Sequence, residues 1–293
     1  MNYGVLLSSL RKSRKISQAD LSASITSQSA LSRFEAGGEV YARNLISYLK
    51  KLNIHPTEFF MLAEDTDFIA QQNFNHRLQS GFVSKTDCEV LAKEEHSRYI
   101  ETGNVLNLKN AVHVQAVYAK IHALPLNDYQ KDLEKVKQYL LSIDTWMMFE
   151  VTLYLDLLFI FDDSFINHQH HRMARSLQSL PFGTELRQGL SAAYGNNLII
   201  LDFERNNLLS LSQHINYLES TLSKNPRNLI SSIRIDFYNK MFDLKKYYSD
   251  DVAIDALETL MILKKYHYVE SYEDLKKFLF EHIPVSQYIK NQY

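Results

Sequence analysis

The sequence is poor in the residues that interrupt helices and in the residue that forms disulfides. Its 293 residues include 8 glycines, 5 prolines and one cysteine, Cys88. A single cysteine excludes an internal disulfide framework and zinc modules built on four thiolates, and it suits a reducing compartment. Few glycines and prolines leave helices room to run without interruption.

Long apolar runs and a secretion signal are also missing. The most apolar window, residues 146–161, contains Glu150 and Asp156, whereas a bilayer-spanning helix needs about 20 mostly apolar residues. The N-terminus lacks the order of a signal peptide, because its basic residues, 11–15, follow the apolar ones. We therefore expect a cytoplasmic protein with no membrane partner.

Charge is present but unevenly distributed. The whole chain has a formal net charge of -2. Residues 1–60 hold 8 basic and 4 acidic side chains, a net charge of +4, which leaves −6 for the remainder. A basic N-terminal region indicates an end that faces nucleic acid, although a solvated basic helix would give the same count.

The first sixty residues predict five short helices. Ser17 is an expected N-cap and Thr26-Ser27 is a second capping signal, since a hydroxyl can accept a hydrogen bond from a free backbone N–H. Gly37 and Gly38 end the third helix, and the fifth begins near Thr57. The polar run 64–67 is the expected boundary between a domain of residues 1–65 and a second of residues 66–293.

The third helix of this region has the composition of a helix that reads DNA. It opens with small and polar residues, so it can approach base edges closely; Gln28 suits an adenine edge, and Arg33 suits a phosphate or a guanine. Gln18 is expected at the start of the second helix, where it can donate a hydrogen bond to a DNA phosphate. Arg43 is expected in the loop before the fourth helix, where it would bind the phosphate backbone of the DNA. The predicted DNA contacts are Gln18, Ser27, Gln28, Ser29, Ser32, Arg33 and Arg43.

The remainder of the chain predicts longer helices, and no strand alternation is visible. Apolar residues step by three and four, as in Leu208, Leu211, Ile215, Leu218 and Leu222. Breaks at roughly twenty-residue intervals, among them 103–104, 180–183 and 269–271, predict helix pairs of about forty residues, the period of helical-repeat arrays. An ordinary all-α globule would give the same periodicity, so both architectures stay open at this point.

Two resemblances follow from these motifs. Ser17-Gln18 and Leu31-Ser32-Arg33-Phe34-Glu35 resemble the helix-turn-helix domain of the XRE (Cro/repressor-like) family. In that family an arginine of the first helix pairs with the glutamate that ends the third, which implies a structural pair of Arg11 and Glu35. With its helical body and its Trp146…Phe149-Glu150…Leu153-Tyr154 pattern, the chain as a whole resembles the Rgg/GadR/MutR regulators.

The resemblance implies an all-α protein with a five-helix XRE-type helix-turn-helix domain, followed by a TPR-like α-solenoid of helix pairs. It further implies a homodimer that binds double-stranded DNA at a near-palindromic promoter site and is controlled by a short signalling peptide. Some members cross-link their dimer through a cysteine in the DNA-binding domain. This chain has no cysteine there, so redox locking by that route is not expected.

The peptide would need polar side chains that satisfy its backbone, together with apolar pockets. Candidates lie on the middle and late helices: Asp156, Tyr194, Asn197, Arg234, Phe237 and Tyr238. Asp156 stands where the family often has asparagine, which would suit a different, basic ligand. Each candidate could also be an ordinary solvent-facing residue or the partner in an interhelical hydrogen bond.

Other functions find little support in the sequence. It contains no glycine-rich phosphate loop, no nucleophile elbow and no HExxH motif, so neither an enzyme nor a cofactor is expected. The histidine-rich segment with His168, His170 and His171 is interpreted as a solvated helix start rather than a metal site. Residues i and i+2 of a helix point to different faces, so these side chains would not converge on one ion. The alternatives are a helical-repeat adaptor with a vestigial DNA-binding domain, or a regulator that senses a protein or a small metabolite.

Overall fold

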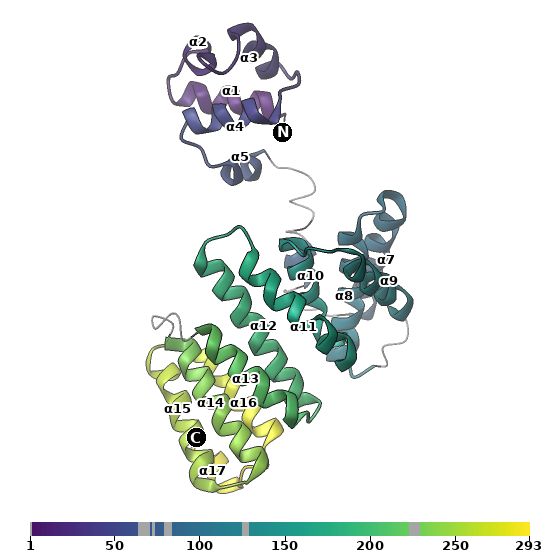
Figure 1. The fold of residues 1–293 in the computed structure, drawn as a ribbon, viewed down its shortest axis with the longest axis vertical. Helices are drawn as coiled ribbons and strands as arrows, with labels where there is room; N and C mark the ends of the chain where they lie inside the picture. Colours follow the sequence, from purple (N-terminus) through teal and green to yellow (C-terminus); the bar gives the residue numbers. More distant parts are fainter. Residues whose placement is uncertain (1, 64–70, 72–73, 79–83, 125–128, 223–228) are drawn as a thin grey trace. The chain divides into compact units, whose positions relative to one another are not determined.

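The computed structural model describes residues 2–63, 71, 74–78, 84–124, 129–222 and 229–293. It divides into two compact units, unit 1 (Met1–Val90) and unit 2 (Leu91–Tyr293). Every regular element within the described residues is a helix (Figure 1), which confirms the all-α prediction. The predicted domain boundary between residues 65 and 66 lies outside the described residues.

Unit 1 opens with the five predicted short helices. They are α1 (Tyr3–Ser13), α2 (Gln18–Ser22), α3 (Gln28–Glu35), α4 (Ala42–Lys51) and α5 (Pro56–Leu62). Ser17 and Ser27 cap α2 and α3, as predicted, by accepting from the backbone N–H groups of Asp20 and Ala30. The expectation that Arg43 lies in a loop is wrong, because Tyr41 is the extended N-cap and α4 begins at Ala42.

The core of unit 1 forms beneath α3. Leu7, Leu21 and Leu31 are fully buried, and Phe34 is 3% exposed. Gly4 lets α1 approach the end of α3, since a Cβ at this position would lie 1.7 Å from the carbonyl oxygen of Phe34. The position of α3 is therefore set by packing along its inner face and by a close backbone contact at its end.

Unit 2 contains the longer helices. They are α7 (Lys85–Thr102), α8 (Val105–Ile121), α9 (Gln130–Ser142), α10 (Met148–Leu157), the 3-10 turn η2 (Leu158–Ile160), α11 (Asp163–Ser179), α12 (Thr184–Glu204), α13 (Leu208–Leu222), α14 (Leu229–Lys246), α15 (Asp250–Lys265), α16 (Val269–His282) and α17 (Gln287–Gln292), with α7 beginning just before the division between the units. Among these described helices none combines the length and apolar character needed to cross a bilayer.

The predicted helix breaks at residues 103–104 and 180–183 are confirmed, and the one at 269–271 is wrong. Gly103 separates α7 from α8 with a φ of +68°, a conformation that suits glycine. The break expected at residues 269–271 falls earlier, because α16 already begins at Val269 and His267 takes the positive φ. The prolines at 125 and 226, which mark two further predicted breaks, lie outside the described residues.

Consecutive helices of unit 2 pack against each other instead of collecting around one centre. The closest associations join α12 with α13 and α14 with α15. The buried side chains form two clusters, one spanning α8 to α12 around Trp146 and Tyr154, the other spanning α12 to α17 around Phe237 and Leu257. Stacked helix pairs with serial cores are the arrangement of a helical repeat, so the solenoid prediction is confirmed over the globule.

Candidate functional site

The outer face of α3 leaves the predicted base-reading side chains free. Gln28, Ser29, Ser32 and Arg33 are exposed, while Leu31 and Phe34 on the opposite face are buried. The hydroxyls of Ser27 and Ser29 lie 3.0 Å apart at the start of the helix. An amphipathic helix that presents short polar residues can lie in a major groove without a steric barrier.

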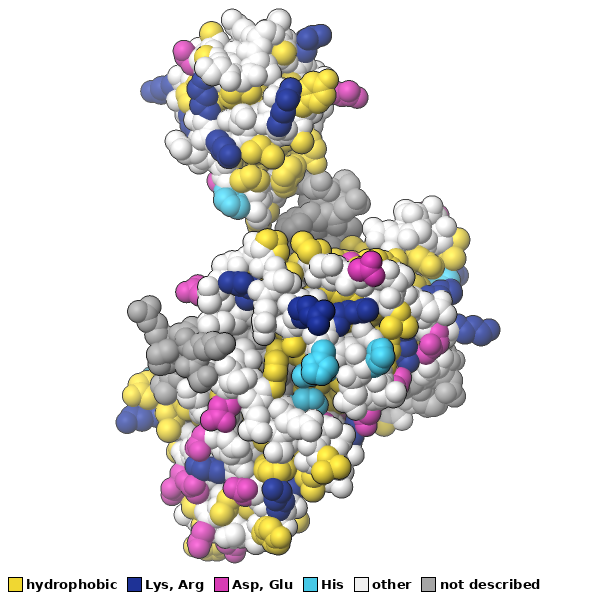
Figure 2. Space-filling model, viewed as in Figure 1, with side chains coloured by type: hydrophobic (Ala, Val, Ile, Leu, Met, Phe, Trp, Pro, Cys, Tyr) yellow, Lys and Arg dark blue, Asp and Glu magenta, His cyan; other side chains and the backbone are white. Residues whose placement is uncertain are grey.

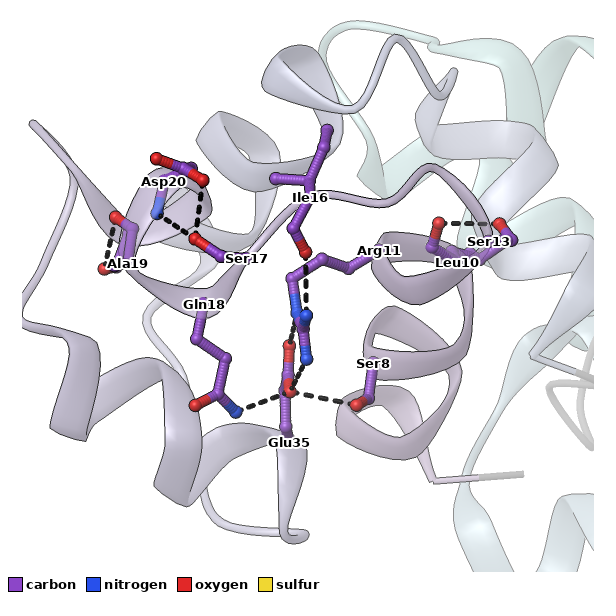
Figure 3. Close-up of polar contacts among 11 residues, drawn as sticks. Ser8, Leu10, Arg11, Ser13, Ile16, Ser17, Gln18, Ala19, Asp20 and Glu35 are labelled. Carbon is purple, nitrogen blue, oxygen red and sulfur yellow. Dashed lines mark hydrogen bonds and ion pairs between the residues drawn. The ribbon is translucent and has the colours of Figure 1, made fainter.

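Glu35, the last residue of α3, is the centre of a hydrogen-bond network (Figure 3). Arg11 donates from Nε to Oε1 at 2.6 Å and from Nη2 to Oε2 at 2.7 Å, and both side chains are buried. Ser8 Oγ and Gln18 Nε2 donate to Oε2 at 2.9 and 2.8 Å. Burial by itself raises the pKa of the Glu35 carboxyl, but the bonds from Arg11, Gln18 and Ser8 outweigh it and hold the pKa below its ordinary value.

This network fixes the angle between the helices that form the motif. Arg11 also donates from Nη1 to the carbonyl of Ile16 at 2.8 Å, so one guanidinium joins α1, the turn before α2 and the end of α3. Gln18, the predicted phosphate contact, uses one amide N–H for Glu35, and its second N–H is left for another acceptor.

A second basic group lies at the start of α4. The guanidinium of Arg43 lies 5.8 Å from the ring centroid of Tyr41, and both side chains are exposed. Beside them is a hollow of about 590 Å³ between α3 and α4, to which Arg33 and Tyr41 both contribute. On the face that Figure 2 shows, Lys and Arg side chains are prominent over the part of unit 1 that holds α1 to α5, whereas acidic side chains gather on the end of unit 2 that holds α14 and α15.

Unit 2 contains a pocket of about 390 Å³, here named the central pocket, between α8, α10 with η2, and α12. Its wall is mainly apolar, and polar groups stand among the apolar ones. The residues that line it are His113, Val117, Lys120, Ile121, Leu155, Asp156, Leu158, Phe159, Asn197, Ile200, Leu201 and Glu204. Mostly apolar walls with a few placed polar groups are typical of ligand sites, and the structure brings the predicted residues Asp156 and Asn197 together here.

The charged groups at the central pocket occur in pairs. Lys109 Nζ, behind the wall, lies 2.6 Å from Asp156 Oδ2. Lys120 Nζ lies 2.9 Å from Glu204 Oε1. Burial, with a smaller contribution from Lys109, lowers the pKa of His113 to about 4 against the opposing effect of Asp156. At neutral pH the imidazole is therefore uncharged, and each ion pair joins one positive and one negative side chain.

Comparison with known proteins places the chain in a family. A helix-turn-helix model matches residues 7–59. The model of the C-terminal domain of the HTH-type transcriptional regulator Rgg matches residues 91–274, which is more than half of the chain. The chain belongs to the Rgg family of transcriptional regulators. No curated protein matches it in sequence.

Solved structures agree with this Rgg assignment at the level of the fold. The SHP pheromone receptor Rgg2 of Streptococcus dysgalactiae is 18% identical with a TM-score of 0.71, and the match covers 96% of this chain and 100% of the receptor. A putative transcriptional regulator from Listeria monocytogenes EGD-e is 17% identical at a TM-score of 0.73, with coverages of 97% and 99%. The PrgX/cCF10 complex is 13% identical at a TM-score of 0.62, with coverages of 96% and 92%.

Several residues predicted to bind peptide lie elsewhere in this Rgg protein. Tyr194 is fully buried, and its hydroxyl lies 3.0 Å from His170 Nδ1. Phe237 and Tyr238 belong to the core of α12 to α17, with exposed fractions of 0% and 2%. Arg234 is half-buried on α14 and does not line the central pocket. Aromatic residues at helical spacing face the core because their large apolar area is buried there most favourably.

The reading of the histidine-rich segment as a solvated helix start is wrong for His170. Its ring is half-buried beside Tyr194 and His214, and burial lowers its pKa to about 4. No group of metal-binding side chains occurs among the described residues. Cys88 is buried, and this burial raises the pKa of its thiol to about 11, so the thiolate is disfavoured.

Sequence reasoning missed most of the polar groups at the central pocket, namely Lys109, His113, Lys120 and Glu204. A usable signal existed. Residues 109, 113, 117 and 120 follow one another by four, four and three along α8, so they share a helix face. Asn197 and Glu204 are likewise seven apart on α12.

Proposed function

We propose that this Rgg-family protein is a homodimeric transcriptional regulator. Unit 1 would bind a near-palindromic promoter site, and a short signalling peptide would control the protein through the central pocket. The observation that carries the DNA-binding half is the exposed face of α3, held rigidly from behind by Arg11 and Glu35. Two such helices in a symmetric dimer would read half-sites about one helical turn, roughly 34–36 Å, apart.

The individual DNA contacts divide into two kinds. Gln28 and Arg33 have the geometry for base edges, and Ser29 and Ser32 allow close approach. Gln18, Ser27 and Arg43 would contact the phosphate backbone from the starts of α2, α3 and α4. Backbone contacts set the register of the protein on DNA, and base contacts set the sequence preference.

The DNA-binding half is tested by fluorescence anisotropy of the full chain on promoter fragments from beside its own gene. We expect tight binding that weakens steeply with salt and a dimer by light scattering. Absence of binding at every salt concentration would contradict the proposal. The alternative of an adaptor with a vestigial DNA-binding domain expects a chain lacking residues 1–65 to keep its activity.

The central pocket supports the peptide half. It joins an apolar wall to Asn197, whose side-chain amide both donates and accepts hydrogen bonds and so can pair with a peptide backbone. Its position on α8, α10 and α12 alternates with the intervening α9 and α11, as expected for one face of a helical repeat. PrgX, which shares this fold, has been solved in a complex with cCF10.

Calorimetric titration tests this half, with synthetic peptides encoded by short reading frames next to the gene. We expect Asn197→Ala to weaken binding about tenfold, the equivalent of one good hydrogen bond to a buried partner. Asn239→Ala, an exposed asparagine on α14, is the matched control and should bind like the parent. Equal losses in both variants would argue against the pocket.

A further inference from the structure

Unit 2 contains a second hollow, here named the α9–α11 hollow, of about 660 Å³ between α9 and the first half of α11. It shares no lining residue with the central pocket, and it lies on the helices that alternate with those of that pocket. Apart from Leu141 and Phe165, every residue that lines it is polar. The two cavities therefore suit ligands of different chemistry.

Two carboxylates at this hollow share one lysine. Lys137 Nζ lies 3.0 Å from Glu134 Oε1 and 2.9 Å from Asp162 Oδ2. The Lys137 side chain is 14% exposed, whereas those of Glu134 and Asp162 are 57% and 56% exposed. The bond from Lys137 lowers the pKa of Asp162, so this carboxylate is ionised at neutral pH. Two carboxylates against one ammonium leave a net charge of −1 at the mouth of the hollow.

Gln169 supplies a second, independent sign of a ligand. It lines the hollow although it is only 1% exposed, so it belongs to the floor. Its Oε1 atom is buried and has no hydrogen-bond partner among the described residues. Buried side-chain oxygens nearly always accept a hydrogen bond in folded proteins. The floor of the hollow thus offers an acceptor that the fold itself leaves unused.

The arrangement favours a cation that carries several hydrogen-bond donors. An anion would approach the oxygens of Glu134 and Asp162 and be repelled. A guanidinium group presents five N–H donors in one plane and keeps its charge at every physiological pH. It can therefore reach carboxylates on both helices and the amide oxygen of Gln169 together. An ammonium is more compact and more strongly hydrated, so it loses more on entering.

We propose that the α9–α11 hollow binds the guanidinium group of a cationic ligand, with Glu134 and Asp162 pairing its charge and Gln169 Oε1 accepting one of its N–H groups. The site is additional to the proposed function, because it shares no residue with the central pocket or with unit 1. Two sources present the same group: a free small guanidine, or an arginine side chain of another protein.

Saturation-transfer NMR titrations of the full chain test this proposal with four small probes. n-Butylguanidine represents the free compound, and N-acetyl-arginine N-methylamide represents an arginine within a polypeptide. n-Pentylamine and N-acetyl-lysine N-methylamide are the matched ammonium probes. We expect the guanidinium probes to bind about fivefold more tightly than the ammonium probes, because only they can form parallel pairs of N–H···O bonds.

Two variants locate the binding. Gln169→Met keeps the length of the side chain and removes the acceptor, and it should weaken the guanidinium probes about tenfold. Its melting temperature should not fall, since no hydrogen bond of the fold is lost. Asp162→Asn should weaken them about threefold, as expected for an exposed charge. Asparagine can still cap α11 by accepting from the N–H of Phe165, so the fold is retained.

Asp236→Asn is the matched control for the loss of charge. Asp236 is 54% exposed and lies 2.9 Å from Lys240, which is 18% exposed and also pairs with Asp255. The same grouping of two carboxylates on one lysine thus occurs on α14 and α15, away from the α9–α11 hollow, and this variant should bind the probes as the parent does. If Gln169→Met does not fold, the exposed double variant Glu134→Gln with Asp162→Asn takes its place, with an expected loss of about tenfold.

Each outcome decides for or against the site. Binding of both guanidinium probes supports it, and binding of only one supports it and identifies the source of the ligand. Absence of binding, equal binding of the ammonium probes, or unchanged affinity in the hollow variants overturns it. Equal losses in Asp236→Asn overturn it as well, because they would reflect the overall charge of the chain. None of these results bears on DNA binding or on peptide binding in the central pocket.

Discussion

The two units use the same kind of ion pair in opposite ways. In unit 1, Arg11 and Glu35 are both buried, with side-chain exposures of 8% and 5%, and Ser8 and Gln18 add further bonds to the carboxylate. In unit 2, Lys109 is equally buried, but Asp156 opens to a pocket. A closed pair with extra donors fixes geometry, whereas a pair with one open side leaves its carboxylate exposed at a pocket.

The comparison is tested most severely by breaking the closed pair. Glu35→Ala leaves the buried Arg11 guanidinium without its carboxylate, and we expect it to lower the free energy of unfolding of unit 1 by about 3–5 kcal/mol. Urea denaturation followed by circular dichroism measures this loss, and DNA binding should fall with it. Glu39→Ala, an exposed acid just beyond α3, should change stability little; similar losses in both would contradict the role given to Glu35.

A milder test of the closed pair uses pH. The pKa of Glu35 is depressed in the folded chain, so the carboxylate stabilises the fold above its unfolded pKa of about 4.3, and this contribution disappears as the pH falls through the folded value. The stability difference between the parent and Glu35→Gln should therefore be constant near neutrality and shrink in acid. A difference that grows on acidification would mean that the carboxylate does not carry the effect.

The outer face of α3 offers a smaller effect of a different kind. Gln28→Ala should weaken binding to the operator by about 1–3 kcal/mol and relax the base preference at one position. Arg43→Ala should weaken binding to all sequences alike and reduce the slope of affinity against salt by about one. Anisotropy titrations at several salt concentrations distinguish the two variants. If Gln28→Ala behaves like Arg43→Ala, then Gln28 contacts phosphate.

The smallest expected effect concerns the exposed pair of the central pocket. Lys120 and Glu204 are 49% and 34% exposed, so solvent screens their attraction, and Lys120→Met should change the free energy of unfolding by about 0–1 kcal/mol. Thermal denaturation at low and high salt measures it. A loss of unfolding free energy as large as that caused by Glu35→Ala would contradict the comparison. It would show that the exposure of an ion pair does not determine how much the pair stabilises the fold.

How much could be predicted from the sequence also differs between the units. In unit 1 the helices and their caps were predictable, because Ser17 and Ser27 act on neighbours within three residues. In unit 2 the helices followed from periodicity, yet the central pocket combines residues from three helices far apart in the chain, and periodicity does not reveal which helices adjoin. Asp156 and Asn197 were predicted to lie at a ligand site and do line the pocket, whereas Tyr194 and Phe237 were assigned to a ligand although packing required them.

The glycine at position 4 has a consequence for how such a protein can change its operator. Gly4 of α1 contacts the end of α3, and the inner side of α3 is held by the buried residues Leu31, Phe34 and Glu35. The position of α3 therefore does not depend on the side chains of its outer face. On the proposed function, exchanging the four exposed side chains Gln28, Ser29, Ser32 and Arg33 should change the preferred DNA sequence without disturbing the core of unit 1. Under the same proposal, a few substitutions on this face would direct the protein to a different promoter, while unit 2 stays unchanged.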